Sequence, residues 1–257
     1  MRGDSEPVLR GHWFVAVAVS ALVLASVSCG GGDEDVVDVF AAASLTDAFT
    51  DLAAAFERAH PDSAVRLNFA GTSTLREQLL DGADADVFVS ANMAIMDELI
   101  AEGAVAGQPQ VMASNTLVLA VPTDDPGRVD DLSDVSRPEL LIGVCARGVP
   151  CGDLAHRFLE LHDVTPEVDT EEPDVRSLAR RLADRELDAA LIYRSDVVAD
   201  HDHLRAVRLD PDRYEPLESR YPIAAIDRDD PGAAEFVDFV LGPEGRSVLE
   251  QWGFTVR

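Results

Sequence analysis

Residues 36–46 read Val-Val-Asp-Val-Phe-Ala-Ala-Ala-Ser-Leu-Thr and contain the pattern on which the predicted architecture rests. The first half is apolar and β-branched, which predicts a short, largely buried strand. Large apolar residues then recur at helical spacing, namely Leu45, Phe49, Leu52 and Phe56. Ser44 is placed to cap this helix, with Asp47 as the acidic partner of a capping box. A strand that leads directly into a helix directs free N–H groups into the crevice beyond it, where an anion can bind. A plain capped helix is the alternative.

Strands and helices continue to alternate along the chain. Further strands are expected at 64–69, 86–90, 116–121, 140–144, 189–193, 204–209 and 221–226. Further helices are expected from Leu75 to about Gly82, at 93–102, 153–161, 175–187 and 195–200, and at 233–254 with an interruption at Gly242-Pro243. Residues 145–152 are expected to form a loop. This alternation predicts an α/β protein with mainly parallel sheets flanked by helices.

Two of the expected strands, 116–121 and 221–226, bracket the second group of elements. In the simplest topology the chain crosses to a second lobe near Val118 and returns near Ile223. Residues 36–117 and 223–257 then form lobe I, residues 118–222 form lobe II, and a ligand cleft lies between them.

The chain is strongly acidic. Its 257 residues carry a formal charge of −27, and every basic residue is an arginine. Such a surface argues against nucleic acid and anionic membrane surfaces as partners. It is compatible with a small anion that is held by local hydrogen-bond donors.

The N-terminal region has the pattern of an export signal. Arg2 and Arg10 accompany an apolar run from Trp13 to Val27, which is too short for an ordinary membrane-spanning helix. Small residues, Cys29 and a glycine-rich stretch follow, which resembles a lipoprotein signal peptide. We therefore expect a signal peptide at 1–28, a tether at 29–35, lipid anchoring at Cys29 and an extracytoplasmic location. Ser26 stands where a bulky aliphatic residue is usual, so ordinary cleavage that leaves Cys29 as a free thiol is the alternative.

The remaining cysteines are Cys145 and Cys151. An exported protein meets an oxidising environment, in which such a close pair favours a disulfide. Two free buried thiols are the alternative.

Several short motifs occur together between Val36 and the C-terminus. They are Val39–Thr46, Phe69–Leu75, Gly82–Ala91, Val149–Gly152, Asp174–Arg176, Ile192–Asp196 and Trp252–Val256. In this order they resemble the molybdate-binding proteins of ABC transporters. The resemblance implies the two-lobed, type II periplasmic-binding-protein fold. It also implies a monomeric binding protein, not an enzyme, that needs no cofactor, captures molybdate or tungstate and delivers the oxyanion to a membrane permease.

The resemblance also implies a set of ligand-binding residues, position by position. They are the hydroxyl and N–H of Ser44, the hydroxyl of Thr72, the N–H groups of Cys151 and Val175, and the phenol of Tyr193. Thr72 stands where this family usually has a serine, and Ser73 is a candidate for a secondary contact.

Charged residues flank this set. Asp47 would repel an anion, so we expect it to cap its own helix and face away. Arg147 and Arg176 either offset that repulsion or are solvated surface residues.

Other functions remain open at this stage. The ligand could be another oxyanion, such as sulfate or a phosphonate, and molybdate and tungstate are too similar in size to be ranked. An exported hydrolase that uses Ser44 is a further alternative. No Gly-x-Ser-x-Gly elbow surrounds that serine, and the six histidines show no metal or triad spacing.

Overall fold

The structure of the chain, a computed structural model, describes residues 35–227 and 229–256. The predicted signal peptide at 1–28, the predicted lipidation site Cys29 and the tether up to residue 34 lie outside the described residues. Within the described part of the chain, no helix combines the length and apolarity needed to cross a bilayer.

The first strand and helix form where residues 36–56 predict them. β1 (Asp35–Ala42) leads through a 3-10 turn, η1 (Ala43–Leu45), into α1 (Thr46–Ala59). The predicted capping box is wrong, because neither the turn nor the helix has a side-chain cap. The additional turn moves the N-cap position to Leu45 and leaves Ser44 buried within the turn.

The remaining elements continue the strand–helix alternation. In the first half they are β2 (Ser63–Ala70), α2 (Thr72–Leu80), β3 (Val87–Val89), α3 (Met93–Ala101) and β4 (Gln110–Pro122). In the second half they are η2 (Leu132–Ser136), β5 (Ile142–Cys145), α4 (Pro150–Leu161), β6 (Thr170–Glu172), α5 (Val175–Ala183), β7 (Ala189–Tyr193), α6 (Arg194–Ala199), β8 (Leu204–Ala206), β9 (Glu218–Ala225), α7 (Pro231–Leu241) and α8 (Pro243–Gln251).

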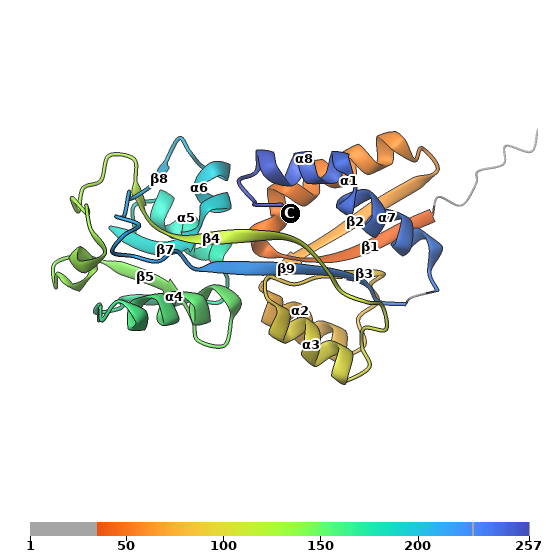
Figure 1. The fold of residues 1–257 in the computed structure, drawn as a ribbon, viewed down its shortest axis with the longest axis horizontal. Coiled ribbons are helices and arrows are strands. Elements are labelled where there is room, and N and C mark those ends of the chain that lie inside the picture. The colour runs from red at the N-terminus through yellow and green to blue at the C-terminus, as the bar shows by residue number, and fades with distance from the viewer. Residues whose placement is uncertain (1–34, 228, 257) are drawn as a thin grey trace, which may run out of the picture. The chain divides into compact units, whose positions relative to one another are not determined.

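The strand order is β2-β1-β3-β9-β4-β7-β5-β6, with β8 beside β4. β1 is parallel to β2 and β3, and β5 is parallel to β6 and β7. β4 and β9 are antiparallel to each other and run side by side between the two groups of elements (Figure 1). The α/β class with parallel sheet segments and flanking helices is confirmed, and the two long antiparallel strands join its halves.

The pairing of β4 changes partner along its length. Its first part pairs with β9 up to Thr116, and its second part pairs with β7 from Leu117 onward. One buried core packs Phe49, Phe56 and Phe236 on the β9 side, while a separate core lies on the β7 side. The predicted lobe limits, 36–117 with 223–257 and 118–222, stay a prediction. The change of partner in β4 supports the first limit, and the start of β9 at Glu218 favours placing the second slightly earlier.

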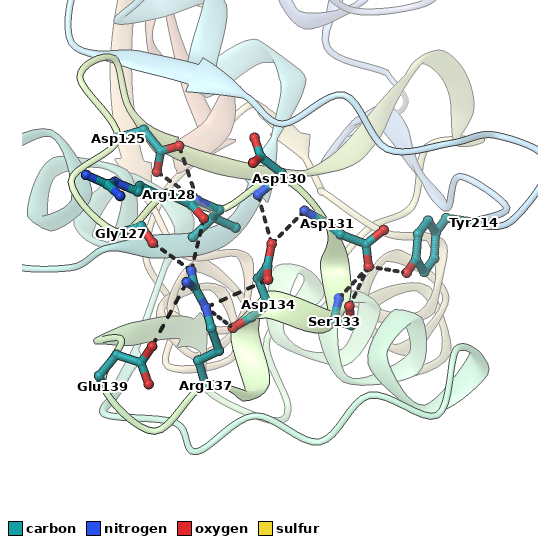
Figure 2. Close-up of polar contacts among 11 residues, drawn as sticks. Asp125, Gly127, Arg128, Asp130, Asp131, Ser133, Asp134, Arg137, Glu139 and Tyr214 are labelled. Atoms are coloured by element: carbon teal, nitrogen blue, oxygen red, sulfur yellow. Dashed lines mark hydrogen bonds and ion pairs between the residues drawn. The ribbon is translucent and has the colours of Figure 1, made fainter.

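A polar network fixes the connection between β4 and β5 in lobe II (Figure 2). Asp131 and Asp134 form a capping box at η2, and Arg137 donates to the carbonyl of Gly127 at 2.6 Å. The phenol of Tyr214 donates to Asp131 at 2.7 Å. The hydroxyl of Ser133 also bonds this carboxylate and, as the largest cause, lowers the pKa of Asp131 to about 2. The network ties the long connection to a distant part of the same lobe.

Candidate anion-binding site

A small cavity lies where the carboxyl ends of β1 and β7 meet the N-terminal ends of three helices, α2, α4 and α5. Its volume is about 20 Å³. The residues that line it are Ala43, Ser44, Gly71, Thr72, Ala91, Val149, Pro150, Cys151, Pro173, Asp174, Val175 and Tyr193. All five residues that the resemblance indicated as ligands are therefore in one place. Both predicted lobes contribute to this wall.

The hydroxyl of Thr72 is positioned to donate into the cavity. Thr72 is the first residue of α2 and is 2% exposed. The backbone N–H of Ala91 donates to its Oγ1 at 3.1 Å. Because this bond uses the oxygen as an acceptor, the hydroxyl proton is left for a partner in the cavity.

The hydroxyl of Ser44 is held by a tyrosine that the sequence did not indicate. Its Oγ lies 2.9 Å from the phenol oxygen of Tyr221, on β9. Burial raises the pKa of the Tyr221 phenol, which keeps that group protonated and able to donate. When Tyr221 donates to Ser44, the serine proton is free to point into the cavity.

Tyr193 supplies a third hydroxyl, at the end of β7. The residue is 1% exposed, and within the described part of the chain its phenol oxygen makes no hydrogen bond of good geometry, although the side chains of Ser219 and Tyr221 lie close enough to act on its pKa. Burial raises the pKa of this phenol too, so the group stays a donor at neutral pH. Leaving a buried donor unpaired costs about 1–3 kcal/mol. The weakly paired phenol of Tyr193 is therefore available to a partner that enters the cavity.

Two backbone donors come from helix N-termini. Cys151 lies in the first turn of α4, and Val175 is the first residue of α5. N–H groups in a first turn have no intrahelical acceptor, and the helix dipole places partial positive charge there. A disulfide joins Cys145 to Cys151 and so connects this first turn to the end of β5.

One carboxylate, that of Asp174, also lines the cavity. Its two oxygens accept from the N–H and the hydroxyl of Ser177, at 2.9 and 3.0 Å. Asp174 therefore caps its own helix, α5, and its negative charge is engaged there.

The buried carboxyl group of Asp196, which the sequence analysis did not indicate, contacts the backbone of Tyr193. Asp196 is 1% exposed, and its Oδ2 accepts the backbone N–H of Tyr193 at 3.0 Å. Desolvation by burial raises the pKa of Asp196 to about 7. Asp196 follows Tyr193 by three residues, which is the spacing of a capping box at the start of α6. This spacing was the sequence signal that could have identified Asp196.

The charged residues near the cavity behave differently from one another. The prediction that Asp47 caps α1 is wrong, because its carboxylate pairs with Arg176 at 2.6 Å and α1 has no side-chain cap. Arg147 contacts Glu160 at 3.4 Å on the surface, with both side chains well exposed. In the described residues, no group of three or more His, Cys, Asp or Glu side chains is arranged to hold a metal ion.

Comparison with known proteins places this chain in a family. Residues 37–255 match the family model described as bacterial extracellular solute-binding protein. The molybdate-binding protein ModA of Mycobacterium tuberculosis strain H37Rv is 35% identical over 251 residues, which cover 92% of this chain and 95% of that protein.

Two solved structures share the fold. One is the periplasmic molybdate-binding protein of Azotobacter vinelandii, with a TM-score of 0.73 and 18% identity over 86% of this chain and 99% of that one. The other is the sulfate-binding protein SubI of Mycobacterium tuberculosis, with a TM-score of 0.75 and 14% identity over 86% of each chain. At these identities the likeness shows the fold alone.

Proposed function

We propose that this chain captures molybdate, because it belongs to the bacterial extracellular solute-binding proteins and, among them, to the molybdate-binding family. Tungstate, which has nearly the same size, is the second ligand that we propose. The observation that supports this most directly is the cavity wall, in which Ser44, Thr72, Cys151, Val175 and Tyr193 present neutral donors from both lobes.

The chemistry of these donors suits an oxyanion. A tetrahedral dianion has four oxygens that accept many hydrogen bonds, and bonds to a charged acceptor are the strong kind. Three hydroxyls and two helix N-termini supply such bonds without a positively charged side chain in the cavity wall. Neutral donors favour the fully deprotonated ligand, because a proton on the ligand would face another donor.

Delivery to a membrane permease follows from the family and completes the proposal. We propose that the mature protein acts as a monomer outside the cytoplasm, anchored by lipid at Cys29. The chain belongs to a family of transporter binding proteins, not of enzymes. The hydroxyl of Ser44 is bonded to Tyr221, which agrees with a binding role for that serine.

Calorimetric titration of the mature chain tests the ligand. Molybdate and tungstate are expected to bind with similar affinity, and sulfate and phosphate far more weakly. Tight binding of sulfate with weak binding of molybdate would replace the proposal by its alternative, a binding protein for another oxyanion such as sulfate or a phosphonate. The cavity uses neutral donors that sulfate could also accept, so only the measurement of size selectivity separates the two.

A further inference from the structure

Several contacts outside the proposed ligand set connect the predicted lobes, and three of them involve residues close to the cavity. Asp47, in the first turn of α1, pairs with Arg176, in the first turn of α5, at 2.6 Å between Oδ2 and Nη2. The hydroxyl of Ser73 donates to the carbonyl of Gly148 at 2.8 Å. At Gly71 the lobes approach so closely that an added Cβ would lie 2.8 Å from the carbonyl oxygen of Pro173.

A glycine is needed at position 71 because lobe II lies so close, and not because of the backbone conformation at this position. The φ of −55° and ψ of 138° of Gly71 are open to any residue. A side chain there would therefore be acceptable to lobe I alone and would crowd only the facing lobe. The two lobes are in direct contact around the cavity mouth.

The ion pair resolves a conflict in the charge distribution. Asp47 lies one turn after Ser44, so an unpaired carboxylate at this position would repel an anion in the cavity. Arg176 follows Val175, one of the proposed donors, and offsets that charge by direct contact. The pair is formed by opposite lobes, and its side chains are 31% and 33% exposed. The electrostatic attraction between the two side chains therefore depends on whether the cleft is closed.

We propose that Asp47 and Arg176 form an inter-lobe ion pair that exists only in the closed cleft and slows release of the bound anion. The proposal rests on the proposed function, because it concerns release from the same cavity. A pair of this exposure changes an equilibrium by up to about 5-fold. Since the pair breaks on opening, most of that effect falls on the dissociation rate.

The variant Asp47→Asn separates this role from simple charge repulsion. If Asp47 only repelled the anion, its neutralisation would tighten binding and slow release. If it closes the cleft through Arg176, molybdate should leave about 2- to 5-fold faster, although a negative charge has been removed. Stopped-flow dissociation measures the rate, and Glu98→Gln is the matched control. Glu98 pairs with Arg76 at 2.8 Å, and the arginine is as exposed as Arg176 while the carboxylate is more exposed than that of Asp47. Both residues of this pair belong to lobe I.

A double-mutant cycle identifies the partner. The double variant Asp47→Asn/Arg176→Gln should release molybdate about as fast as Asp47→Asn alone, because the pair is already lost in the single variant. Arg176→Gln should release it at least as fast, because this variant also leaves the carboxylate of Asp47 unpaired near the anion. Additive effects, or slower release from Asp47→Asn, would overturn the proposal.

A ligand-free measurement keeps this test distinct from that of the function. A ligand-free cleft that exchanges between open and closed forms loses closed form when the pair is removed. X-ray scattering without any oxyanion should therefore give a larger radius of gyration for Asp47→Asn than for the wild type and Glu98→Gln. If the wild type bound no oxyanion, the proposed function would fail and this comparison alone would decide the ion pair. Equal radii for the three proteins would then reject it.

Discussion

The phenol of Tyr193 is the residue-scale feature that most directly tests the site. Because its oxygen makes no hydrogen bond of good geometry within the described residues, Tyr193→Phe removes a donor at little cost to the fold. A hydrogen bond to a charged acceptor contributes about 1.5–3 kcal/mol, so molybdate affinity should fall roughly 10- to 150-fold. The ligand-free melting temperature should change little. Calorimetry and thermal unfolding measure the two quantities.

Tyr214→Phe is the matched control for this substitution. Tyr214 donates to Asp131 at 2.7 Å, in the network of lobe II shown in Figure 2, and does not line the cavity. Its variant should lower the ligand-free melting temperature and leave molybdate affinity unchanged. If the two tyrosine variants exchanged these behaviours, the phenol of Tyr193 would belong to the fold, and the site would have to be redrawn without it.

Asp196 predicts a pH dependence of stability. Its pKa in the folded protein, about 7, is higher than the ordinary value, so the folded state retains a proton that the unfolded state loses. The resulting stabilisation is complete below about pH 4 and is lost as pH rises through 7, by about 1.4 kcal/mol per pH unit at most. Asp196→Asn keeps an acceptor for the N–H of Tyr193 and should remove this slope.

Thermal unfolding between pH 5 and 8 measures the difference between Asp196→Asn and the wild type. Asp131→Asn is a control of opposite sign, because the pKa of Asp131 is lowered to about 2. Its stabilisation is present above about pH 4 and is lost only as pH falls through 2, so its effect should be constant in the measured range. Parallel curves for Asp196→Asn and the wild type would contradict the prediction.

At the scale of elements, the disulfide joins β5 to the first turn of α4. In a Cys29→Ser background, peptide mapping without reduction should show Cys145 linked to Cys151. Reduction should lower the free energy of unfolding by roughly 2 kcal/mol, the value expected for so short a loop. It should also weaken molybdate binding, because the turn that presents the N–H of Cys151 is then less restrained.

The double variant Cys145→Ser/Cys151→Ser controls for the reductant. It should resemble the reduced protein in stability and affinity, and reductant should not change it further. Recovery of both thiols as alkylatable groups from the native protein would remove the disulfide from the account.

Helix α4 shows why the sequence located elements better than their ends. A loop was expected at residues 145–152, but the helix begins at Pro150. Proline suits the first helical position, where its missing N–H is not needed. Gly152 is required for packing, because a Cβ there would overlap the carbonyl oxygen of Ala146. Neither reason is visible in a local pattern.

Strands that depend on partners were also harder to predict. β6, with the sequence Thr-Glu-Glu, lies at the edge of the sheet and has no apolar alternation. β4 begins at Gln110, six residues before its apolar run, because that part pairs with β9. In both cases the ladder of hydrogen bonds, and not the local propensity, determines the extent of the strand.

The candidate site was likewise predictable from the sequence only in part. The five proposed ligand residues lie in motifs that a family resemblance can identify, and the structure brings them to one cavity. The bond between Ser44 and Tyr221 joins residues 177 positions apart, and the Asp47–Arg176 pair likewise joins distant elements. Such contacts leave no periodic signal in the sequence, so only the fold reveals them.

At the scale of the whole molecule, the cavity wall predicts motion. Ser44 and Thr72 come from one lobe, and Cys151, Val175 and Tyr193 come from the other. An anion that bonds both lobes stabilises the closed cleft, so saturating molybdate should reduce the radius of gyration in X-ray scattering. An unchanged profile would mean that the lobes are closed already or do not move relative to each other.

The net charge of the molecule leads to the last prediction, which concerns the effect of salt on the rate of association. A chain with a formal charge of −27 repels a dianion at long range, and salt screens this repulsion beyond about 10 Å at 0.1 M. The donors inside the cavity act at contact distance and are little affected. Stopped-flow association of molybdate should therefore become faster between about 10 and 150 mM salt, within the range set by the Debye length. Neutralising a remote acidic residue, as in Glu98→Gln, should change this trend only slightly. Association that slows with salt would mean that arginines near the cavity mouth, Arg176 foremost, determine the local potential against the charge of the whole chain.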